Sequence, residues 1–333
     1  MARYDSRMVR APAGAAGRWR RWAGVAAAAV ILAGALAASR SVARAAPAPK
    51  DDRPTSVALA PGRRAITGNH NKKVHRWNLD NLGANPDKFK IDHVKKVSYV
   101  ATSATKLFTA SFDGTVAISR LDDLAADPVM FRGHSAGIAP DDVPEVWAVV
   151  PSADGEHALS ATNSGQILYW WVGDGTLANP PTVKSSYQLS DEWVGGLAFV
   201  PVAGGDETRF VSSHADGRVC VWQIQNVGHH TAPQRTFSHG NDLPVNSVVV
   251  ARESANAAGK FVVSASFDHT VRIWDLANDD DDQAPVEIDK HTGWVWRVAL
   301  SPDHKKIATA GEDGKVRLFG IDGLPYKAGA AAA

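Results

Sequence analysis

Short runs rich in β-branched residues recur along the chain, and turn-forming residues separate them. The clearest example is the run Lys260–Ser266 (KFVVSAS), followed by a tight turn at Asp268-His269 and a second run, Thr270–Trp274 (TVRIW). Two such runs joined by a short turn predict a β-hairpin. Other predicted hairpin turns have the sequence Asp-Gly, whose residues tolerate the positive φ angles of a two-residue turn. These turns are Asp113-Gly114, Asp216-Gly217 and Asp313-Gly314.

A further apolar run precedes each hairpin and predicts another strand. These runs are Val57–Leu59, Val97–Val100, Val146–Val150, Val194–Val200, Val245–Val250 and Val295–Leu300. One more short strand fits between successive units, for example Val286–Asp289. Each unit is therefore expected to form a four-stranded sheet.

The same polar and aromatic residues return in each unit, with a period of roughly 40 to 50 residues. A Ser or Thr comes first, an Asp or a small polar residue stands four positions later, and an aromatic residue follows in most units. The three columns read Thr67, Thr109, Ser160, Ser212, Ser264 and Thr309; Asn71, Asp113, Ser164, Asp216, Asp268 and Asp313; and Trp77, Ser119, Trp170, Trp222, Trp274 and Phe319. A repeat of this length and content predicts an array of four-stranded sheets.

These units resemble WD40 repeats, and the resemblance covers about residues 53 to 321. It implies an all-β fold, a β-propeller of four-stranded antiparallel blades. In this family a His, a Ser or Thr, an Asp and a Trp form a hydrogen-bonded network inside each blade. The residues that match are His239, Ser264, Asp268 and Trp274 in the fifth unit, and His291, Thr309 and Asp313, with Phe319 in place of Trp, in the sixth.

The other units keep only part of this network. Gly133-His134 supplies the His of the third unit, where Ser164 replaces the Asp, and His93 serves the second unit, where Ser119 replaces the Trp. The first and fourth units lack the His. The resemblance implies weaker networks in those two units, because a buried polar group without its partner costs about 1–3 kcal/mol.

The number of blades follows from the spacing of the aromatic column, which advances by 42, 51, 52, 52 and 45 residues. No interval is wide enough to hide another unit, so we expect six blades, although seven is the commonest number in the family. A closed ring also needs an outer strand for the last blade, because an open propeller leaves strand edges exposed. The candidates are residues 47–53 and 325–328.

The first 45 residues differ from the repeats and predict an export signal. Six arginines precede an uncharged run from Ala23 to Ser39, and Ala43-Arg44-Ala45 then offers a cleavage site. The alternatives are an uncleaved N-terminal anchor and a true start at Met8. Arg20-Arg21 hints at twin-arginine export. The expected organisation is a signal or anchor at 1–45, a propeller at 46–322 and an Ala-rich tail at 323–333. We expect the protein in the bacterial periplasm or cell envelope. If the signal is not cleaved, it would anchor the protein to the inner membrane.

The charge of the exported part argues against a nucleic-acid partner. Residues 1–45 hold eight of the 36 basic residues and one of the 35 acidic ones, so the remainder carries 28 and 34 and a formal charge of about −6. A nucleic-acid-binding domain would show a basic stripe instead.

Motifs for chemistry are lacking, so we expect no catalytic residue, no cofactor and no metal site. The run Asp279–Asp282 lacks the glycine and alternating spacing of a calcium loop. His229-His230 is a poor metal site, because adjacent residues on a loop rarely converge on one ion. Cys220, the only cysteine, is expected to pack inside a blade.

Aromatic residues outside the repeat columns point to a partner-binding face. Two aligned positions at the start of the first strand vary between units, which is not expected of positions that every blade needs for packing. They read Arg53, Lys96, Glu145, Trp193, Pro244 and Trp294, and Thr55, Ser98, Trp147, Gly195, Asn246 and Trp296. In WD40 proteins, the edge where the first strand leaves the connecting loop lies on a face that binds partners. Trp147, Trp193, Trp294, Trp296 and Arg297 are the predicted partner-binding residues, of types that dominate binding hot spots; alternatively, the tryptophans seal gaps between blades.

These observations favour an exported, non-catalytic WD40 propeller that binds a protein or peptide. The alternative is an enzyme or small-ligand receptor that uses the central channel, which would need carboxylates or histidines from several blades. A structural subunit of an envelope complex is a third hypothesis.

Overall fold

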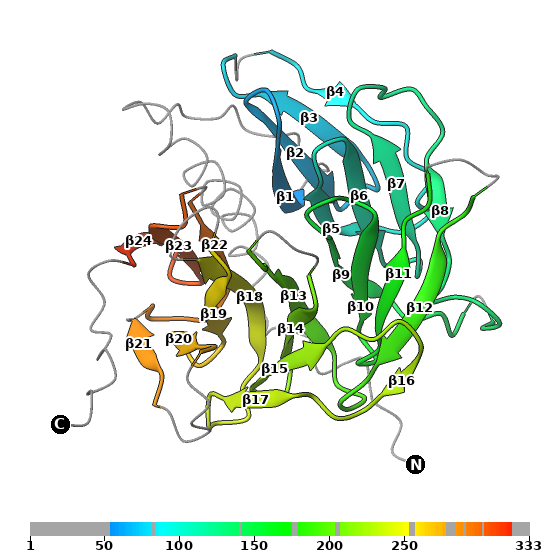
Figure 1. Cartoon of the computed structure of the whole chain (residues 1–333). Coiled ribbons are helices and arrows are strands. Elements are labelled where there is room, and N and C mark those ends of the chain that lie inside the picture. The colour runs from blue at the N-terminus through cyan, green and yellow to red at the C-terminus, as the bar shows by residue number, and fades with distance from the viewer. Residues whose placement is uncertain are drawn as a thin grey trace.

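The computed structural model describes residues 54–321, apart from 82–83, 140, 175–178, 204–206, 253–256, 278–283, 289–290 and 302. The described residues form six sheets arranged in a ring (Figure 1). The chain is a six-bladed β-propeller, which confirms the predicted fold class. Residues 1–45, the run Asp279–Asp282 and the tail at 323–333 lie outside the described residues.

The first three blades follow one another along the chain. Their strands are β1 (Pro54–Ala60), β2 (Arg64–Asn69), β3 (Val74–Asn78) and β4 (Asp87–Lys88); β5 (Val97–Thr102), β6 (Lys106–Ser111), β7 (Val116–Arg120) and β8 (Val129–Phe131); and β9 (Val146–Pro151), β10 (His157–Thr162), β11 (Ile167–Trp171) and β12 (Thr182–Tyr187). Within each blade, strands adjacent in sequence pair antiparallel.

The last three blades repeat this plan. Their strands are β13 (Val194–Val200), β14 (Arg209–His214), β15 (Arg218–Gln223) and β17 (Arg235–Ser238); β18 (Val245–Arg252), β19 (Gly259–Ser266), β20 (Val271–Asp275) and β21 (Val286–Ile288); and β22 (Val295–Leu300), β23 (Lys306–Gly311) and β24 (Val316–Gly320). The chain between β15 and β17 also forms β16 (Gly228–His230), which pairs parallel with β12 and gives blade 3 a fifth strand.

The first strands of the blades line the centre of the ring (Figure 1). From β1 through β5, β9, β13 and β18 to β22, each contacts the next in this order. The hairpin turns after the second strands lie at the same end of the ring as the starts of the first strands, because these strands pair antiparallel. The predicted Asp-Gly turns have the required geometry, with positive φ angles of 81°, 84° and 75° at Gly114, Gly217 and Gly314.

The hydrophobic core lies between neighbouring sheets. One cluster joins blades 2 and 3, for example, where Phe131 stacks on Trp170 with ring centroids 4.1 Å apart. Similar clusters join blades 1 and 2, 3 and 4, 4 and 5, and 5 and 6. Burial between sheets supplies the hydrophobic stabilisation that each thin blade lacks alone.

Blade 6 and blade 1 are joined less tightly among the described residues. All seven residues of β1 are only half-buried, and the side chain of Leu318 in β24 is 41% exposed. Blade 6 has three described strands, and both candidates for its fourth strand, residues 47–53 and 325–328, lie outside the described part of the chain.

Candidate functional site

A β-bulge occupies the second of the two variable positions in all six blades. The bulged residues are Thr55, Ser98, Trp147, Gly195, Asn246 and Trp296. A bulge leaves one residue unpaired and redirects its side chain. Ser98 Oγ donates to the carbonyl of Val146 at 2.5 Å, and Asn246 Nδ2 donates to the carbonyl of Trp296 at 2.7 Å. Small polar residues therefore link neighbouring blades here, whereas blades 3 and 6 carry a tryptophan.

The four predicted tryptophans lie together, and two phenylalanines join them. Six rings form a chain of contacts across blades 2 to 6, which we call the aromatic arc: Phe112, Trp147, Trp193, Phe267, Trp294 and Trp296. Phe112 stacks on Trp147 with centroids 5.9 Å apart, and Trp147 lies 5.1 Å from Trp193. Phe267 then bridges Trp193, at 6.4 Å, to Trp294, at 4.7 Å.

Backbone hydrogen bonds fix the arc at the end of the propeller that carries the hairpin turns. The N–H of Phe112 donates to the carbonyl of Lys96 at 3.1 Å, and the N–H of Glu312 donates to the carbonyl of Trp294 at 2.6 Å. Phe112 and Phe267 each stand three residues after the Ser/Thr column, at the first position of the turn. Strand starts and turns thus place their aromatic side chains on one surface.

The rings of the arc differ in exposure. The side chain of Trp294 is 39% exposed, whereas Trp147, Trp193 and Trp296 are half-buried. Trp193 packs over Gly195 of its own blade, where a Cβ atom would stand 2.8 Å from the ring. Part of the arc therefore fills space between blades, and Trp294 presents the most accessible surface.

Arg297 lies on the innermost strand of blade 6, and its guanidinium reaches blade 2. The guanidinium carbon lies 4.7 Å from the ring centroid of Tyr99 on β5. A cation–π contact of this kind is an internal link between two blades. Arg297 thus sits over Tyr99 rather than among the arc rings that surround its neighbour Trp296.

One cation already lies on the arc. The ammonium group of Lys96 lies 3.6 Å from the ring centroid of Phe112. Burial lowers the pKa of Lys96, and the nearby Glu145 carboxylate opposes this shift. The same carboxylate accepts a hydrogen bond from Nε1 of Trp147 at 2.9 Å. Ring and carboxylate together hold a positive charge at the blade 2 end of the arc.

The polar networks lie inside the blades. In blade 5, His239 bonds to Asp268 Oδ2 and to Ser264 Oγ, each at 2.9 Å, and Trp274 Nε1 donates to the same hydroxyl at 3.0 Å. Although burial raises the pKa of Asp268, hydrogen bonds from His239 and Thr270 hold it well below its usual value. In blades 6 and 2, His291 and His93 contact their Asp and Thr partners in the same way.

Three blades contain polar network residues that the repeat columns do not include. In blade 3, Gln166 Oε1 contacts His134 Nδ1 at 2.9 Å in the role expected of the missing Asp. In blade 4, His214 Nε2 contacts Ser212 Oγ at 2.7 Å. In blade 1, His75 contacts the Asn69 amide at 3.2 Å. Blades 1 and 4 thus lack the His before the blade, as the sequence indicates, and each carries a His within a strand, His75 in β3 and His214 in β14. Nδ1 of His214 is buried without a hydrogen-bond partner among the described residues.

The remaining candidates are engaged in local structure. His229 Nδ1 contacts Ser186 Oγ at 2.9 Å, and the ring of His230 packs on Tyr187. Cys220 is buried in blade 4 as expected, and burial raises the pKa of its thiol to about 12. The described residues include no cluster of three or more His, Cys, Asp or Glu suited to a metal ion. They also include no helix that could cross a membrane.

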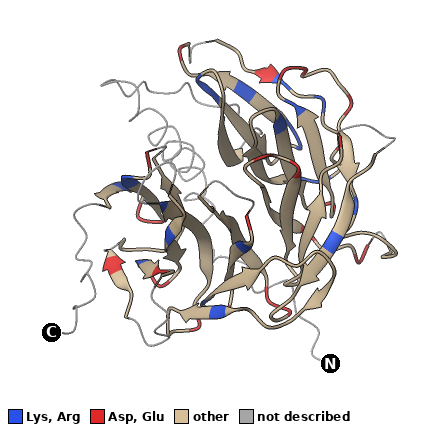
Figure 2. Cartoon of the chain, in the orientation of Figure 1, with Lys and Arg blue, Asp and Glu red and all other residues tan. Residues whose placement is uncertain are grey.

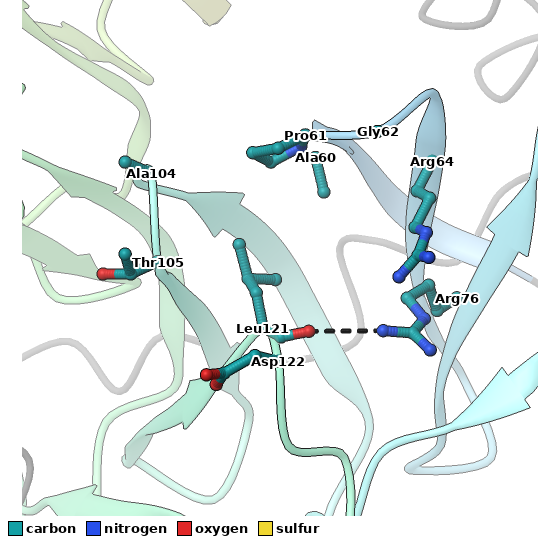
Figure 3. A pocket seen from close by; sticks show the side chains of 9 residues that line it. All are labelled: Ala60, Pro61, Gly62, Arg64, Arg76, Ala104, Thr105, Leu121 and Asp122. Atoms are coloured by element: carbon teal, nitrogen blue, oxygen red, sulfur yellow. Dashed lines mark hydrogen bonds between the residues drawn. The ribbon is translucent and has the colours of Figure 1, made fainter.

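A pocket of about 380 Å³ lies between blades 1 and 2 (Figure 3). It lies at the turns that follow the first strands, β1 and β5, and therefore at the end of the propeller opposite the aromatic arc. It is lined by Ala60, Pro61, Gly62, Arg64, Arg76, Ala104, Thr105, Leu121 and Asp122. Arg76 donates to the Leu121 carbonyl at 3.2 Å and to Asp87, and Asp122 is paired with Arg120. The pocket therefore offers mainly the exposed Arg64 to a ligand.

The last two blades match the family described as "WD domain, G-beta repeat", over residues 231–275 and 285–319. One similar protein is Target of rapamycin complex subunit wat1 from Schizosaccharomyces pombe, which is 22% identical over 66% of this chain and 63% of the relative. A guanine nucleotide-binding protein subunit beta from Oryza sativa is 28% identical over 39% of this chain and 32% of the relative. Human Coronin-7 is 28% identical over 42% of this chain and 14% of the relative. The matches support the WD40 repeat family for this chain. In each case less than two thirds of the relative's length is matched.

Proposed function

We propose that this chain is a non-catalytic WD40 propeller that binds a protein or peptide partner at the aromatic arc. The observation that carries the proposal is the continuous contact of six rings from five blades, with Trp294 open to solvent. Aromatic residues in a rigid, well-packed setting are the commonest binding hot spots. By name, two of the relatives are subunits of larger assemblies, which is consistent with this role.

The composition of the central channel favours binding over chemistry. The innermost strands, β1, β5, β9, β13, β18 and β22, contain no Asp, Glu or His within their described bounds. A channel active site would draw its general acid and base from such residues on several blades. The aromatic arc is therefore a better candidate site than the channel.

Affinity capture tests the proposed function. The tagged chain and its Trp294→Ala variant are each incubated with cell-envelope extract, and the retained proteins are compared by quantitative mass spectrometry. We expect at least one protein that the parent retains and the variant loses. Identical sets of retained proteins would exclude Trp294 from the binding site. The matched control is Trp171→Ala, which removes a half-buried tryptophan from the end of β11 away from the arc.

The proposed location is the cell envelope, through the export signal at residues 1–45. Its support is the order of arginines, uncharged run and small residues in the sequence. N-terminal sequencing of the protein from envelope fractions should give a start near Ala46. An intact Met1 on protein from the soluble cytoplasmic fraction would contradict export.

A further inference from the structure

The aromatic arc ends at Trp294, whose surroundings suit a cation. Phe267 covers one face of the Trp294 ring, with planes 7° apart, and Trp296 meets it edge-on at 5.6 Å. The side chain remains 39% exposed. A rigid indole with an open surface is the best aromatic partner for a Lys or Arg side chain.

A carboxylate lies next to Gly293, the residue that precedes Trp294. The backbone N–H of Glu312 donates to the carbonyl of Trp294 at 2.6 Å. Oε2 of Glu312 lies over Gly293, 3.3 Å from where a Cβ atom would stand. No ion pair joins Glu312 to another described residue. Trp294 and Glu312 therefore bring an exposed ring and a carboxylate without an ion pair to neighbouring positions, and a ring and a carboxylate also hold Lys96 at the other end of the arc.

Further carboxylates surround the arc over blades 3 to 6. The exposed acidic residues in the loops and turns at this end are Asp141, Asp142, Asp191, Glu192 and Asp242. Figure 2 shows acidic residues in several of the loops and turns that join the strands. Among the described lysines and arginines at this end of blades 3 to 6, only Arg132 and Lys315 are exposed. The exposed charge at this end of blades 3 to 6 is therefore mainly negative and complements a basic partner, whereas blade 1 carries the exposed Lys72 and Lys73 at the same end.

We propose that the aromatic arc binds a basic peptide segment whose Lys or Arg side chain lies on the open surface of Trp294, with Glu312 beside its charge. This inference rests on the proposed function and adds the chemical class of the partner. An acidic segment would meet carboxylates over four blades, and a purely apolar segment would leave those carboxylates without a counter-ion.

Peptide binding to the full chain tests the proposal. The probes are a labelled oligo-arginine, a labelled oligo-glutamate and a labelled Gly-Ser peptide of the same length, measured by fluorescence anisotropy at low salt. We expect oligo-arginine to bind most tightly. Trp294→Ala and Glu312→Gln should each weaken it by about two- to thirtyfold, the range of a cation–π contact or a partly exposed charge pair.

Two control variants separate this site from general attraction to an acidic protein. Trp294→Phe keeps an aromatic face and should retain more binding than Trp294→Ala. Asp303→Asn removes an exposed charge at the opposite end of the propeller and should leave binding within about twofold.

Three outcomes overturn the inference. Oligo-glutamate could bind more tightly than oligo-arginine, oligo-arginine could fail to bind, or Trp294→Ala could weaken binding no more than Asp303→Asn does. Each of these results would exclude a basic partner. If capture of a protein from envelope extract still requires Trp294, the proposed function itself is not contradicted. Loss of that dependence in the capture experiment removes the proposed function itself.

Discussion

Phe267 lies flat against Trp294, with ring centroids 4.7 Å and planes 7° apart. Phe267 comes from the hairpin turn of blade 5 and Trp294 from the start of blade 6, so this stack joins two blades at the end of the propeller. It also holds the Trp294 ring in one orientation before a partner arrives. A ring fixed in advance loses less conformational freedom on binding, which favours affinity.

A double-mutant cycle measures this stack. Phe267→Leu and Trp294→Leu each keep an apolar side chain but remove one ring, and the double variant removes both. An aromatic pair contributes about 0.5–1.5 kcal/mol beyond the area it buries, so we expect a coupling free energy of that size from urea unfolding. A coupling near zero would mean that the two rings merely touch.

The hydrogen-bonded network around Asp268 in blade 5 should contribute more to stability than Ser164, which takes the place of the Asp in blade 3. Asp268 accepts hydrogen bonds from Thr270 Oγ1 at 2.7 Å and Asn241 Nδ2 at 2.9 Å, as well as contacting His239. Ser164 Oγ contacts only Thr162 Oγ1, at 3.0 Å. We expect Asp268→Ala to lower the free energy of unfolding by about 1–3 kcal/mol more than Ser164→Ala. Equal thermal melts for the two variants would contradict the network.

His269 occupies a backbone conformation that favours glycine. Its φ angle is 76°, and the equivalent turn position in blade 6 is Gly314 with φ 75°. An L-residue pays about 1–2 kcal/mol for this conformation, part of which is offset by the greater freedom of glycine in the unfolded chain. His269→Gly should therefore stabilise the protein by about 0.5–1 kcal/mol. The control is Gly314→Ala: a Cβ atom at Gly314 would have open space around it, so the substitution should destabilise the protein through its backbone conformation alone. A loss of stability in His269→Gly would instead show that the imidazole of His269 makes a structural contact.

Buried histidines should make the fold sensitive to mild acid. Burial lowers the pKa of His134 from 6.5 to about 4. Between these pH values the unfolded chain binds a proton that the folded chain excludes. The contribution of His134 to the free energy of unfolding is therefore complete above pH 6.5 and falls as the pH drops toward 4. The loss from this residue is at most about 3 kcal/mol. Urea unfolding near pH 7 and near pH 5 should show a smaller difference for His134→Gln than for the parent, whereas His229→Gln, at an exposed position, should leave the difference unchanged.

The sequence was sufficient for the blade plan because each blade repeats the same packing requirement. The Ser/Thr column predicts the hydroxyl at the centre of each network, and Trp274 and Ser264 meet as the resemblance implies. His214 was missed because it stands two residues after Ser212 on the same strand, not before the blade. The period-two alternation of a strand places both side chains on one face, and this signal could have identified it.

The candidate site was only partly predictable. Variation at two aligned positions pointed to Trp193 and Trp294, but the link between them, Phe267, belongs to a third position in the hairpin turn. The bulge that redirects Trp296 leaves no mark in a single sequence, since serine, asparagine, glycine and tryptophan all occupy that position. The reach of Arg297 to Tyr99 depends on the closure of the ring, which places residues of distant blades together.

The most direct test of the proposed binding site is the affinity of the captured partner for the double variant Trp193→Ala/Trp294→Ala, measured by isothermal titration calorimetry. The proposal predicts that the variant keeps the β-sheet circular-dichroism spectrum of the parent and binds at least about thirtyfold more weakly, as expected when an anchor contributing about 2 kcal/mol or more is removed. Trp171→Ala should bind as the parent does. A folded double variant that binds with the parent's affinity would contradict the proposal.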